Sequence, residues 1–302
     1  MSEAGSRENR VSPVKSDAAG EAYRGKLGDL PENVRAHRRL MRGRKGRSSA
    51  RGSRARWVTF SIIAGCLALI ALAVLDAPVG AYRKQWPAEL IGFARAVTDI
   101  GQTHWYLVPS GLFMIVVLAL DWNRLSRRRR WLLANWYTLA GYVFVTIAAS
   151  GLIATALKRI IGRARPKHFE EHGLLAFDTF AVDADFASFP SGHATAIGAL
   201  AAIFALLFPH LRIIVLILAI ALGSTRILVG AHYPSDVIAG LAFGMWFAYF
   251  VALVFAVRGF IFTAGPGPLP VVRPAFSRFI AATPLRFLAS VSFLQRILRK
   301  SR

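Results

Sequence analysis

The stretch that decides the fold is FPSGHATAIG, residues 189–198, which leads directly into an apolar run ending at Phe208. The run is apolar enough to enter a lipid bilayer, so a histidine at its start is costly unless it has a function. Across the 302 residues, 55% are hydrophobic, and the charges collect at the two ends and in short connections. Such segregation of charge is typical of a polytopic membrane protein.

Six runs with few or no charges follow a polar N-terminal segment, and we expect each to form a membrane-spanning helix. They are 57–75, 105–120, 131–157, 193–208, 211–229 and 237–257. The sequence thus predicts an all-α, six-helix membrane bundle. We expect three parts: a disordered basic tail at 1–56, the six-span domain at 57–257, and a basic amphipathic tail at 258–302.

Basic residues predict the orientation of the spans. Both tails and the NRLSRRRR connection, residues 123–130, are rich in arginine, which favours the cytoplasmic side. An even number of spans allows both tails and this connection to lie on the cytoplasmic side. The connections 76–104, 158–192 and 230–236 then lie outside. The net charge of +22 also suits anionic lipid head groups. Because of the long uncharged runs, we expect membrane lipids and not nucleic acid as partners, and the sequence leaves the oligomeric state open.

One group of polar residues at the ends of the predicted spans falls on the outer side. Lys158 ends the third run, Arg165 follows it by about two helical turns, and Arg226 lies near the end of the fifth run. Ser191 and Gly192 open the fourth run, where free backbone N–H groups and the helix dipole favour an anion. Guanidinium groups fit phosphate oxygens. Together these residues predict a phosphate-binding site.

Two histidines and a carboxylate complete the predicted site. Asp236 lies four residues after His232, so its side chain can reach back to one imidazole nitrogen and leave the other free to attack. His193, at the start of the fourth run, is then placed to protonate a leaving oxygen. We therefore expect His232, Asp236 and His193 to be catalytic.

Three motifs carry a resemblance to a known family. They read KRIIGRARP (158–166), PSGH (190–193) and STRILVGAHYPSD (224–236). In order and spacing they resemble the motifs of the type 2 phosphatidic acid phosphatases, membrane relatives of the vanadium haloperoxidase fold. One departure is visible: Thr225 stands directly before Arg226, where the family has serine, and the serine lies one place earlier at Ser224.

The resemblance implies a mechanism and a location. It implies that His232 becomes a phosphohistidine, that Asp236 orients it, that His193 is the general acid, and that water hydrolyses the intermediate. Phosphate would be held by Lys158, Arg165, Arg226 and the backbone at Ser191 and Gly192. The family needs no metal or other cofactor, and the motifs hold one carboxylate, whereas two-metal sites usually need several. The expected place is a bacterial inner membrane, with the active site facing the periplasm.

The substrate implied by the resemblance is a lipid phosphate monoester or a lipid pyrophosphate. Candidates are undecaprenyl pyrophosphate, phosphatidylglycerol phosphate, phosphatidic acid and lipid A phosphates. Two alternatives remain open from sequence alone. The phosphoryl group could pass to a lipid or sugar instead of water, which would make the protein a phosphotransferase. The protein could also be a binder or transporter of anionic lipid, which would need the cations but not His232.

A second motif, HFEEH at residues 168–172, fits the H-x-x-E-H pattern of one class of zinc protease. It follows a proline and precedes a glycine, and no helical pattern surrounds it. We therefore expect this segment to be a solvated loop and predict no metal site.

Overall fold

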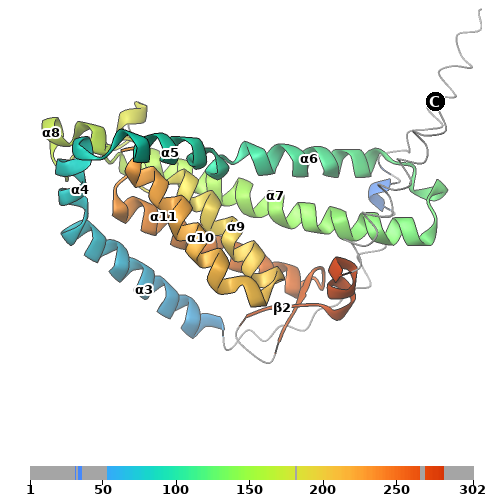
Figure 1. The fold of residues 1–302 in the computed structure, drawn as a ribbon. Helices are drawn as coiled ribbons and strands as arrows, with labels where there is room; N and C mark the ends of the chain where they lie inside the picture. Colours follow the sequence, from blue (N-terminus) through green and yellow to red (C-terminus); the bar gives the residue numbers. More distant parts are fainter. Residues whose placement is uncertain (1–30, 32, 36–52, 181, 266–268, 282–302) are drawn as a thin grey trace, which may run out of the picture.

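The structure is a computed structural model that describes residues 31, 33–35, 53–180, 182–265 and 269–281. Its regular structure is almost entirely helical (Figure 1). The α-helices are α3 Ser53–Val74, α4 Asp76–Tyr82, α5 Ala88–Thr98, α6 His104–Ala119, α7 Arg127–Ile161, α8 Phe169–His172, α9 Gly192–Leu207, α10 Arg212–Leu228 and α11 Pro234–Val257. Short 3₁₀ helices are η1 Arg83–Gln85, η2 Asp99–Gly101, η3 Trp122–Arg124, η4 Pro166–His168, η5 Ala184–Phe186 and η6 Pro209–Leu211. The described part of the chain is all-α apart from one pair of short strands, as the sequence predicted.

Five segments of the described chain are long and apolar enough to cross a membrane. They are Trp57–Val74, Ala88–Ala119, Arg127–Ile161, Pro209–Leu228 and Pro234–Val257. The sixth predicted span is α9, which has 16 residues and would be about 24 Å long, less than the ~30 Å hydrocarbon core. Because α9 packs against α7, α10 and α11, these neighbours shield it from lipid. The fold is that of a multi-pass membrane protein.

The outward faces of these helices are apolar. Leu69 on α3 is 65% exposed, Leu152 on α7 is 73% exposed, and Ile213 on α10 is 75% exposed. A soluble protein rarely leaves a continuous apolar surface of this kind in water. The surface therefore fits contact with lipid chains.

Small residues bring α9 and α11 into close contact at the centre of the bundle. Gly240 and Gly244 on α11 form a G-x-x-x-G pair, and a Cβ on Gly244 would lie 2.0 Å from the carbonyl oxygen of Thr195 on α9. Gly198 on α9 packs equally closely on α11, since a Cβ there would lie 2.2 Å from the Leu241 carbonyl oxygen. This close approach fixes the start of α9 against the start of α11.

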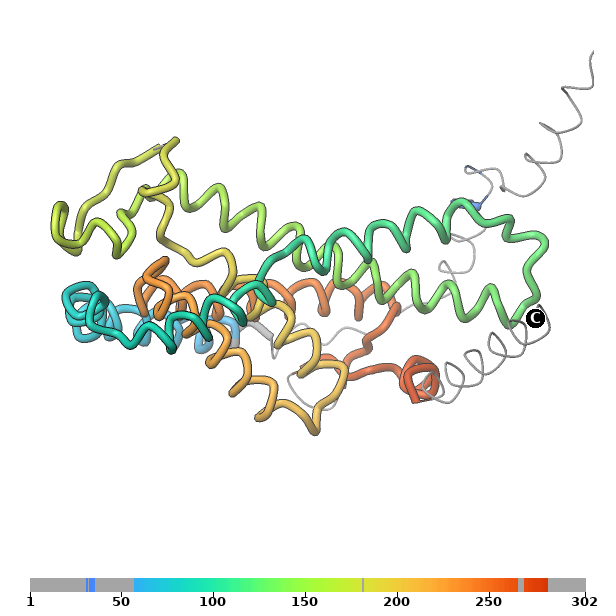
Figure 2. Tube along the Cα trace, turned by 45° about the horizontal axis from the view of Figure 1, so that its top comes forward, coloured from blue at the N-terminus to red at the C-terminus, as the bar shows by residue number. Residues whose placement is uncertain are grey.

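The long helices run along the bundle in alternating directions, with α5 and α6 following one another in the same direction, so helix ends gather at two opposite ends of the molecule (Figure 1). α7 is 35 residues long, about 52 Å, and it connects the two ends. Its first turn carries four of the five arginines of the connection 123–130, and its last turn carries Lys158. Figure 2 shows α4 and α8 together at the Lys158 end. The predicted outer connections therefore share one end, and the basic connection lies at the other.

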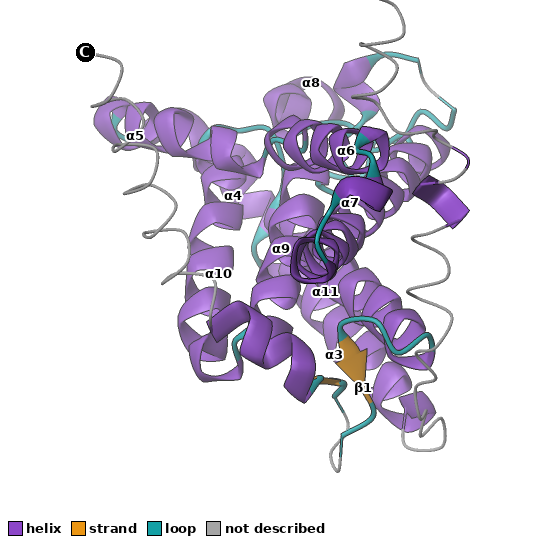
Figure 3. Ribbon diagram, turned by 90° about the vertical axis from the view of Figure 1, so that its right-hand side faces the viewer, coloured by secondary structure: helices purple, strands orange, loops and turns teal. Residues whose placement is uncertain are grey.

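Parts of both predicted tails pack on the bundle. β1 Phe262–Thr263 and β2 Val271–Val272 form an antiparallel pair (Figure 3), and Phe262 joins Phe279 in the core that contains Tyr142 of α7. In the predicted disordered segment 1–56, Asn33 is buried and donates to the Leu118 carbonyl oxygen at 3.0 Å. The helix α3 begins at Ser53. Other residues of both tails lie outside the described residues, and the three-part division stays a prediction.

Candidate active site

The predicted site residues come from four helices and meet at one end of the bundle. Lys158 lies in the last turn of α7 and Arg226 in the last turn of α10. Ser191 caps the start of α9, and Asp236 lies in the first turn of α11. These ends adjoin because α9 packs along both α10 and α11. The fold thus gathers residues that are up to 78 positions apart, from Lys158 to Asp236.

His232 is buried beside Asp236, directly before α11. Its side chain is 2% exposed, and its Nδ1 lies 3.8 Å from Oδ2 of Asp236. This distance is longer than a hydrogen bond, and such contacts often shorten only when substrate is bound. Burial lowers the pKa of His232 to about 4, with Asp236 opposing the shift and Lys158 and Arg165 adding to it. His232 is therefore neutral at pH 7, the form that a nucleophilic imidazole needs.

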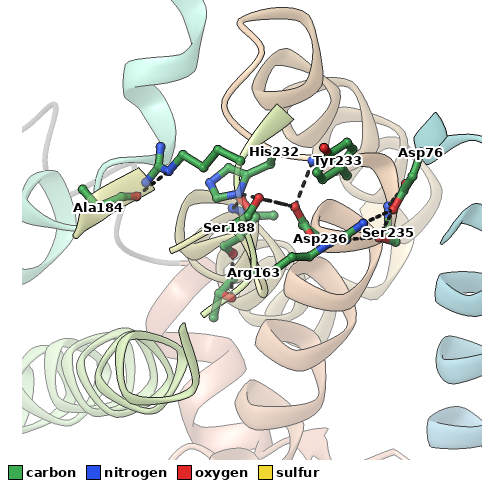
Figure 4. A network of polar contacts seen from close by, with 12 residues as sticks. Asp76, Arg163, Ala184, Ser188, His232, Tyr233, Ser235 and Asp236 are labelled. Carbon is green, nitrogen blue, oxygen red and sulfur yellow. Dashed lines mark hydrogen bonds and ion pairs between the residues drawn. The ribbon is translucent and has the colours of Figure 1, made fainter. Parts of the chain in front are cut away.

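Asp236 is held in place by several donors (Figure 4). Its Oδ2 accepts from Ser188 Oγ at 2.6 Å and from the backbone N–H of Tyr233 at 2.9 Å. Its Oδ1 accepts from Arg163 Nη1 at 2.7 Å. Pro234 at the first helical position suits this capped helix start. The carboxylate that faces His232 is thus fixed from several directions.

Arg163 is a residue that the sequence argument missed. It is 3% exposed and bridges two buried carboxylates, Asp236 and Asp76, which it reaches at 2.7 and 2.9 Å. It also donates to Ser235 Oγ at 2.8 Å and lies 4.3 Å from the ring centroid of Tyr233. We call the five residues Asp76, Arg163, Ser188, Ser235 and Asp236 the backing network.

Asp76 was also missed, although it offered a signal. It lies directly after the predicted first span, and an acid at that depth is expensive unless it is paired. In the structure it is fully buried, and besides Arg163 it accepts from the backbone N–H and the hydroxyl of Ser235. Asp76 therefore ties the start of α4 to the start of α11.

We call Lys158, Arg165 and Arg226 the cationic cluster, and its members Lys158 and Arg165 lie within electrostatic range of His232. Their charges interact: Lys158 is in electrostatic range of both arginines. Among the described residues, no carboxylate forms an ion pair with any of the three. Burial lowers the pKa of Arg165, and Asp185 and Asp236 oppose this. Three partly buried, mutually repelling cations are an arrangement that a bound anion would stabilise.

The start of α9 contributes less than predicted. The N–H of Ser191 donates to the Asp236 carbonyl oxygen at 3.1 Å, so it does not face a phosphate, and its Oγ caps the N–H of Ala194. Gly192, at the first helical position, has no acceptor within the helix for its N–H, because the first turn of any helix lacks one. A Cβ on Gly192 would lie 3.2 Å from Lys158 Nζ, so glycine here leaves room for the ammonium group.

His193 lies at the second position of α9 and is partly buried. Its ring packs on the backbone of η2, where a Cβ on Gly101 would lie 3.1 Å from its Cδ2. It is in electrostatic range of Arg226, His232 and Lys158. The second histidine thus lies beside both His232 and the cationic cluster.

The departure at Thr225 has a structural explanation. The Thr225 hydroxyl contacts the hydroxyl of Thr98 on α5 at 3.1 Å, and Thr98 in turn accepts from Arg226 Nη1 at 3.0 Å. Ser224 bonds to the Ile220 carbonyl oxygen of its own helix. Threonine at 225 therefore supports the arginine through Thr98, a partner that the sequence motifs did not reveal.

Comparison with known proteins gives the same family as the motifs. A family model described as the PAP2 superfamily matches residues 139–260. A lipid A 1-phosphatase of Rhizobium johnstonii is 41% identical over 224 residues, covering 73% of this chain and 90% of that protein. A lipid A 1-phosphatase of Rhizobium etli is 42% identical over 224 residues, covering 73% of this chain and 94% of that protein.

Two more distant likenesses are shorter or weaker. Decaprenylphosphoryl-5-phosphoribose phosphatase of Mycobacterium tuberculosis is 40% identical over 121 residues, 39% of this chain and 57% of that protein. The solved PAP2-type phosphatidylglycerolphosphate phosphatase of Bacillus subtilis matches with a TM-score of 0.43 and 20% identity, over 65% of this chain and 93% of that one. The assignment depends on the long sequence relatives and not on this structural match. The chain belongs to the PAP2 superfamily and is a multi-pass membrane lipid phosphatase.

Proposed function

We propose that the protein removes the 1-phosphate of lipid A at the outer face of a bacterial inner membrane, through a phosphohistidine formed on His232 and without a metal ion. The substrate class comes from two relatives named lipid A 1-phosphatase, each at least 41% identical over 224 residues. The chemistry comes from the site, and one observation carries it. A buried, neutral imidazole lies beside a fixed carboxylate and within electrostatic range of Lys158 and Arg165, two cations that have no ion-pair partner among the described residues.

In the first step, the phosphate monoester enters the cationic cluster with its oxygens toward Lys158, Arg165 and Arg226. Nε2 of His232 attacks phosphorus, and the bond from phosphorus to the lipid oxygen breaks. His193 donates a proton to that oxygen, which leaves as the lipid hydroxyl. Asp236 stabilises the positive charge that develops on the His232 ring.

In the second step, water attacks the phosphohistidine. His193, now neutral, accepts a proton from the water, and the bond from His232 Nε2 to phosphorus breaks. The products are inorganic phosphate and the free enzyme. The cationic cluster stabilises the equatorial oxygens in both steps, which is the electrostatic role that metal ions fill in other phosphatases.

The outer face is supported by the arrangement of charge. The site lies at the end of α7 that carries Lys158, and the arginine-rich connection lies at the opposite end. Under the positive-inside rule the basic end is cytoplasmic, so the site faces the periplasm. Reporter fusions at Gly173 and at Ser126 test this, and a cytoplasmic signal from Gly173 would contradict the orientation.

Turnover of lipid A by purified protein in detergent, with EDTA present, tests the chemistry. Mass spectrometry should show loss of the phosphate at position 1, while phosphatidic acid, phosphatidylglycerol phosphate and undecaprenyl pyrophosphate react more slowly. His232→Ala should lose several orders of magnitude in rate. Ser224→Ala is a matched control and should keep full activity, since its hydroxyl bonds only within α10. Activity that disappears with EDTA, or that survives His232→Ala, would overturn the mechanism.

The two alternatives, a phosphotransferase and a non-catalytic lipid binder, predict different products. A phosphotransferase would yield a phosphorylated lipid or sugar acceptor in place of inorganic phosphate. The non-catalytic binder is disfavoured because the chain belongs to a family of phosphatases. The phosphate released per lipid A consumed decides between water and another acceptor.

A further inference from the structure

The HFEEH segment forms a cluster of possible metal ligands outside the phosphatase site. The sequence argument expected a solvated loop, but η4 and α8 form a short helical segment over Pro166–His168 and Phe169–His172. This conformation places residues three and four apart on one face. As a result, ligand atoms of His168, Glu171 and His172 all lie within 4.8 Å of one another.

The donor set suits a late first-row divalent ion. Two imidazoles and one carboxylate are typical ligands of Zn²⁺, with a water in the fourth position of a tetrahedron. With zinc–ligand distances near 2.0–2.1 Å, neighbouring ligand atoms in a tetrahedron lie about 3.3 Å apart. Here Glu171 Oε2 lies 3.1 Å from His168 Nδ1 and 4.0 Å from His172 Nε2. Small side-chain rotations would complete this geometry.

A carboxylate already occupies the outer position that metal-binding histidines use. His168 Nε2 lies 2.9 Å from Oδ2 of Asp185, and this contact leaves Nδ1 facing Glu171. In metal sites, the ligating histidine almost always donates its other ring N–H to a carboxylate or carbonyl, which fixes the ring orientation. Asp185 is itself held by Lys167 and by its own backbone contact with Asp183. This second observation is independent of the clustering of the three ligands.

Residues other than the three ligands hold α8 in place, so the ligands are not needed to anchor the helix. Glu170 forms an ion pair with Lys84 at 2.6 Å, and the Phe169 ring packs so closely on Gly80 that a Cβ there would lie 2.5 Å from it. Arg83 donates to the Lys167 carbonyl oxygen at 2.9 Å. The segment is thus positioned against α4 and η1 (Figure 2). Its polar side chains remain accessible, since Glu171 is 69% and His172 43% exposed.

The cluster adjoins the phosphate site through the backbone. Arg165 donates its N–H to the Asp185 carbonyl oxygen at 2.9 Å and its Nε to the Ala184 carbonyl oxygen at 2.9 Å. An ion held by His168 would therefore restrain the same 3₁₀ turn that positions Arg165. We propose that His168, Glu171 and His172 bind one Zn²⁺ ion, oriented by Asp185, which braces the rim of the active site without taking part in the chemistry.

Zinc binding by the full-length, tag-free protein in detergent tests the proposal. Protein stripped with EDTA and desalted is titrated with ZnCl₂ in competition with a zinc indicator. Wild type should bind one equivalent, and His172→Ala and Glu171→Gln should abolish the uptake. Asp185→Asn should weaken the affinity about 10–100-fold, as expected for an outer-sphere partner. His210→Ala, which changes a histidine in η6 away from the cluster, is the matched control and should bind as wild type does.

Cobalt substitution gives a second readout. Co²⁺ bound to wild type should show the intense visible absorption of a tetrahedral N/O site, and this should be absent from His172→Ala. Wild type that takes up no zinc, or His172→Ala that binds zinc as wild type does, would overturn the proposal. Folding of each variant of the zinc cluster is checked by its phosphatase activity in EDTA, which does not require the ion, and folding of the inactive His232→Ala by its unfolding temperature.

The zinc proposal and the proposed phosphatase mechanism can be tested independently of each other. Inactive His232→Ala should still bind one equivalent of zinc, because none of the three ligands belongs to the catalytic site. Loss of zinc uptake in His232→Ala would instead assign the ion to the phosphatase site and overturn the rim site.

Discussion

Two charged regions adjoin His232, the backing network and the cationic cluster, and they differ in how their charges are balanced. In the backing network, the one cation, Arg163, bridges two carboxylates at 2.7 and 2.9 Å. In the cationic cluster, the nearest polar contacts of Arg165 and Arg226 are a carbonyl and a hydroxyl oxygen, both neutral. Both regions are at least partly buried, so exposure does not explain the difference.

The difference separates a structural role from a binding role. A buried charge is tolerated when it is paired, and breaking such a pair leaves an uncompensated charge. Cations without carboxylate partners cost stability in the free protein, and a dianionic phosphate would relieve their repulsion. The backing network should therefore be required for folding, and the cationic cluster for binding and catalysis. Each of the following predictions tests that division.

The largest effect should come from Arg163→Met. The substitution leaves Asp76 and Asp236 buried without a cation, so the free energy of unfolding should fall by about 3–5 kcal/mol. Thermal unfolding in detergent, together with the yield of folded protein, measures this. Arg163→Lys keeps the charge but cannot reach both carboxylates as a planar fork, so it should lose less. Arg95→Met, at an exposed position on α5, should melt within a degree or two of wild type.

Lys158→Met should affect activity strongly and stability little. Removing one of the three proposed donors to the transferred phosphoryl group should lower kcat/KM by about 10²–10³-fold, or about 3–4 kcal/mol. The unfolding temperature should stay the same or rise, because like charges then repel less. Inorganic phosphate should raise the unfolding temperature of wild type more than that of the variant. A loss of stability as large as that of Arg163→Met would contradict the proposed division between a structural network and a binding cluster.

The cationic cluster was predictable from sequence, and the backing network was not. Lys158 and Arg226 stand out because each is a charge at or near the end of an apolar run, and Arg165 because it follows Lys158 by about two helical turns. Arg163 lies between the same motif residues, but four other lysines and arginines lie within five positions of it, so the local composition does not single it out. Its role depends on Asp76 of α4 and Asp236 of α11 reaching one point in space.

The fold, like the site, could be predicted from the sequence only where a local pattern determines it. Span positions follow from hydropathy along the chain, and the described helices agree with them except at the second span. That span was predicted to begin at 105, whereas the apolar helical segment of the structure begins at Ala88. The burial of Asn33 and the packing of Phe262 and Phe279 depend on long-range contacts that no local pattern encodes. The convergence of helix ends was predicted only because three motifs shared one side of the membrane. The hydrogen bond from Ser191 to Asp236, which removes an expected phosphate donor, required the close α9–α11 packing to be known.

His232 interacts with charges of both regions, so its titration reports on both. Its folded pKa is about 4, below the ordinary value of 6.5. Between these values the unfolded chain binds a proton that the folded protein excludes, so stability rises with pH and is lost as pH falls from 6.5 toward 4. The slope is at most about 1.4 kcal/mol per pH unit from this one group.

Unfolding temperatures at pH 4.5, 5.5 and 6.5 measure this effect in wild type and in His232→Gln. Wild type should lose stability more steeply on acidification than the variant, because glutamine does not titrate. Equal slopes for the two proteins would mean that His232 is not held neutral by burial.

The smallest effect should come from Thr98→Val, which removes a neutral partner of the cationic cluster. Arg226 Nη1 loses its hydrogen bond at 3.0 Å, while the valine keeps the shape of the side chain. A single hydrogen bond contributes about 0.5–1.5 kcal/mol, so kcat/KM should fall about 2–12-fold with little change in unfolding temperature. Thr98→Ser keeps the hydroxyl and should restore most of the activity. Because Thr98 positions Arg226 and does not neutralise it, a loss approaching that of Lys158→Met would show that a hydroxyl contributes as much as a charge in this cluster.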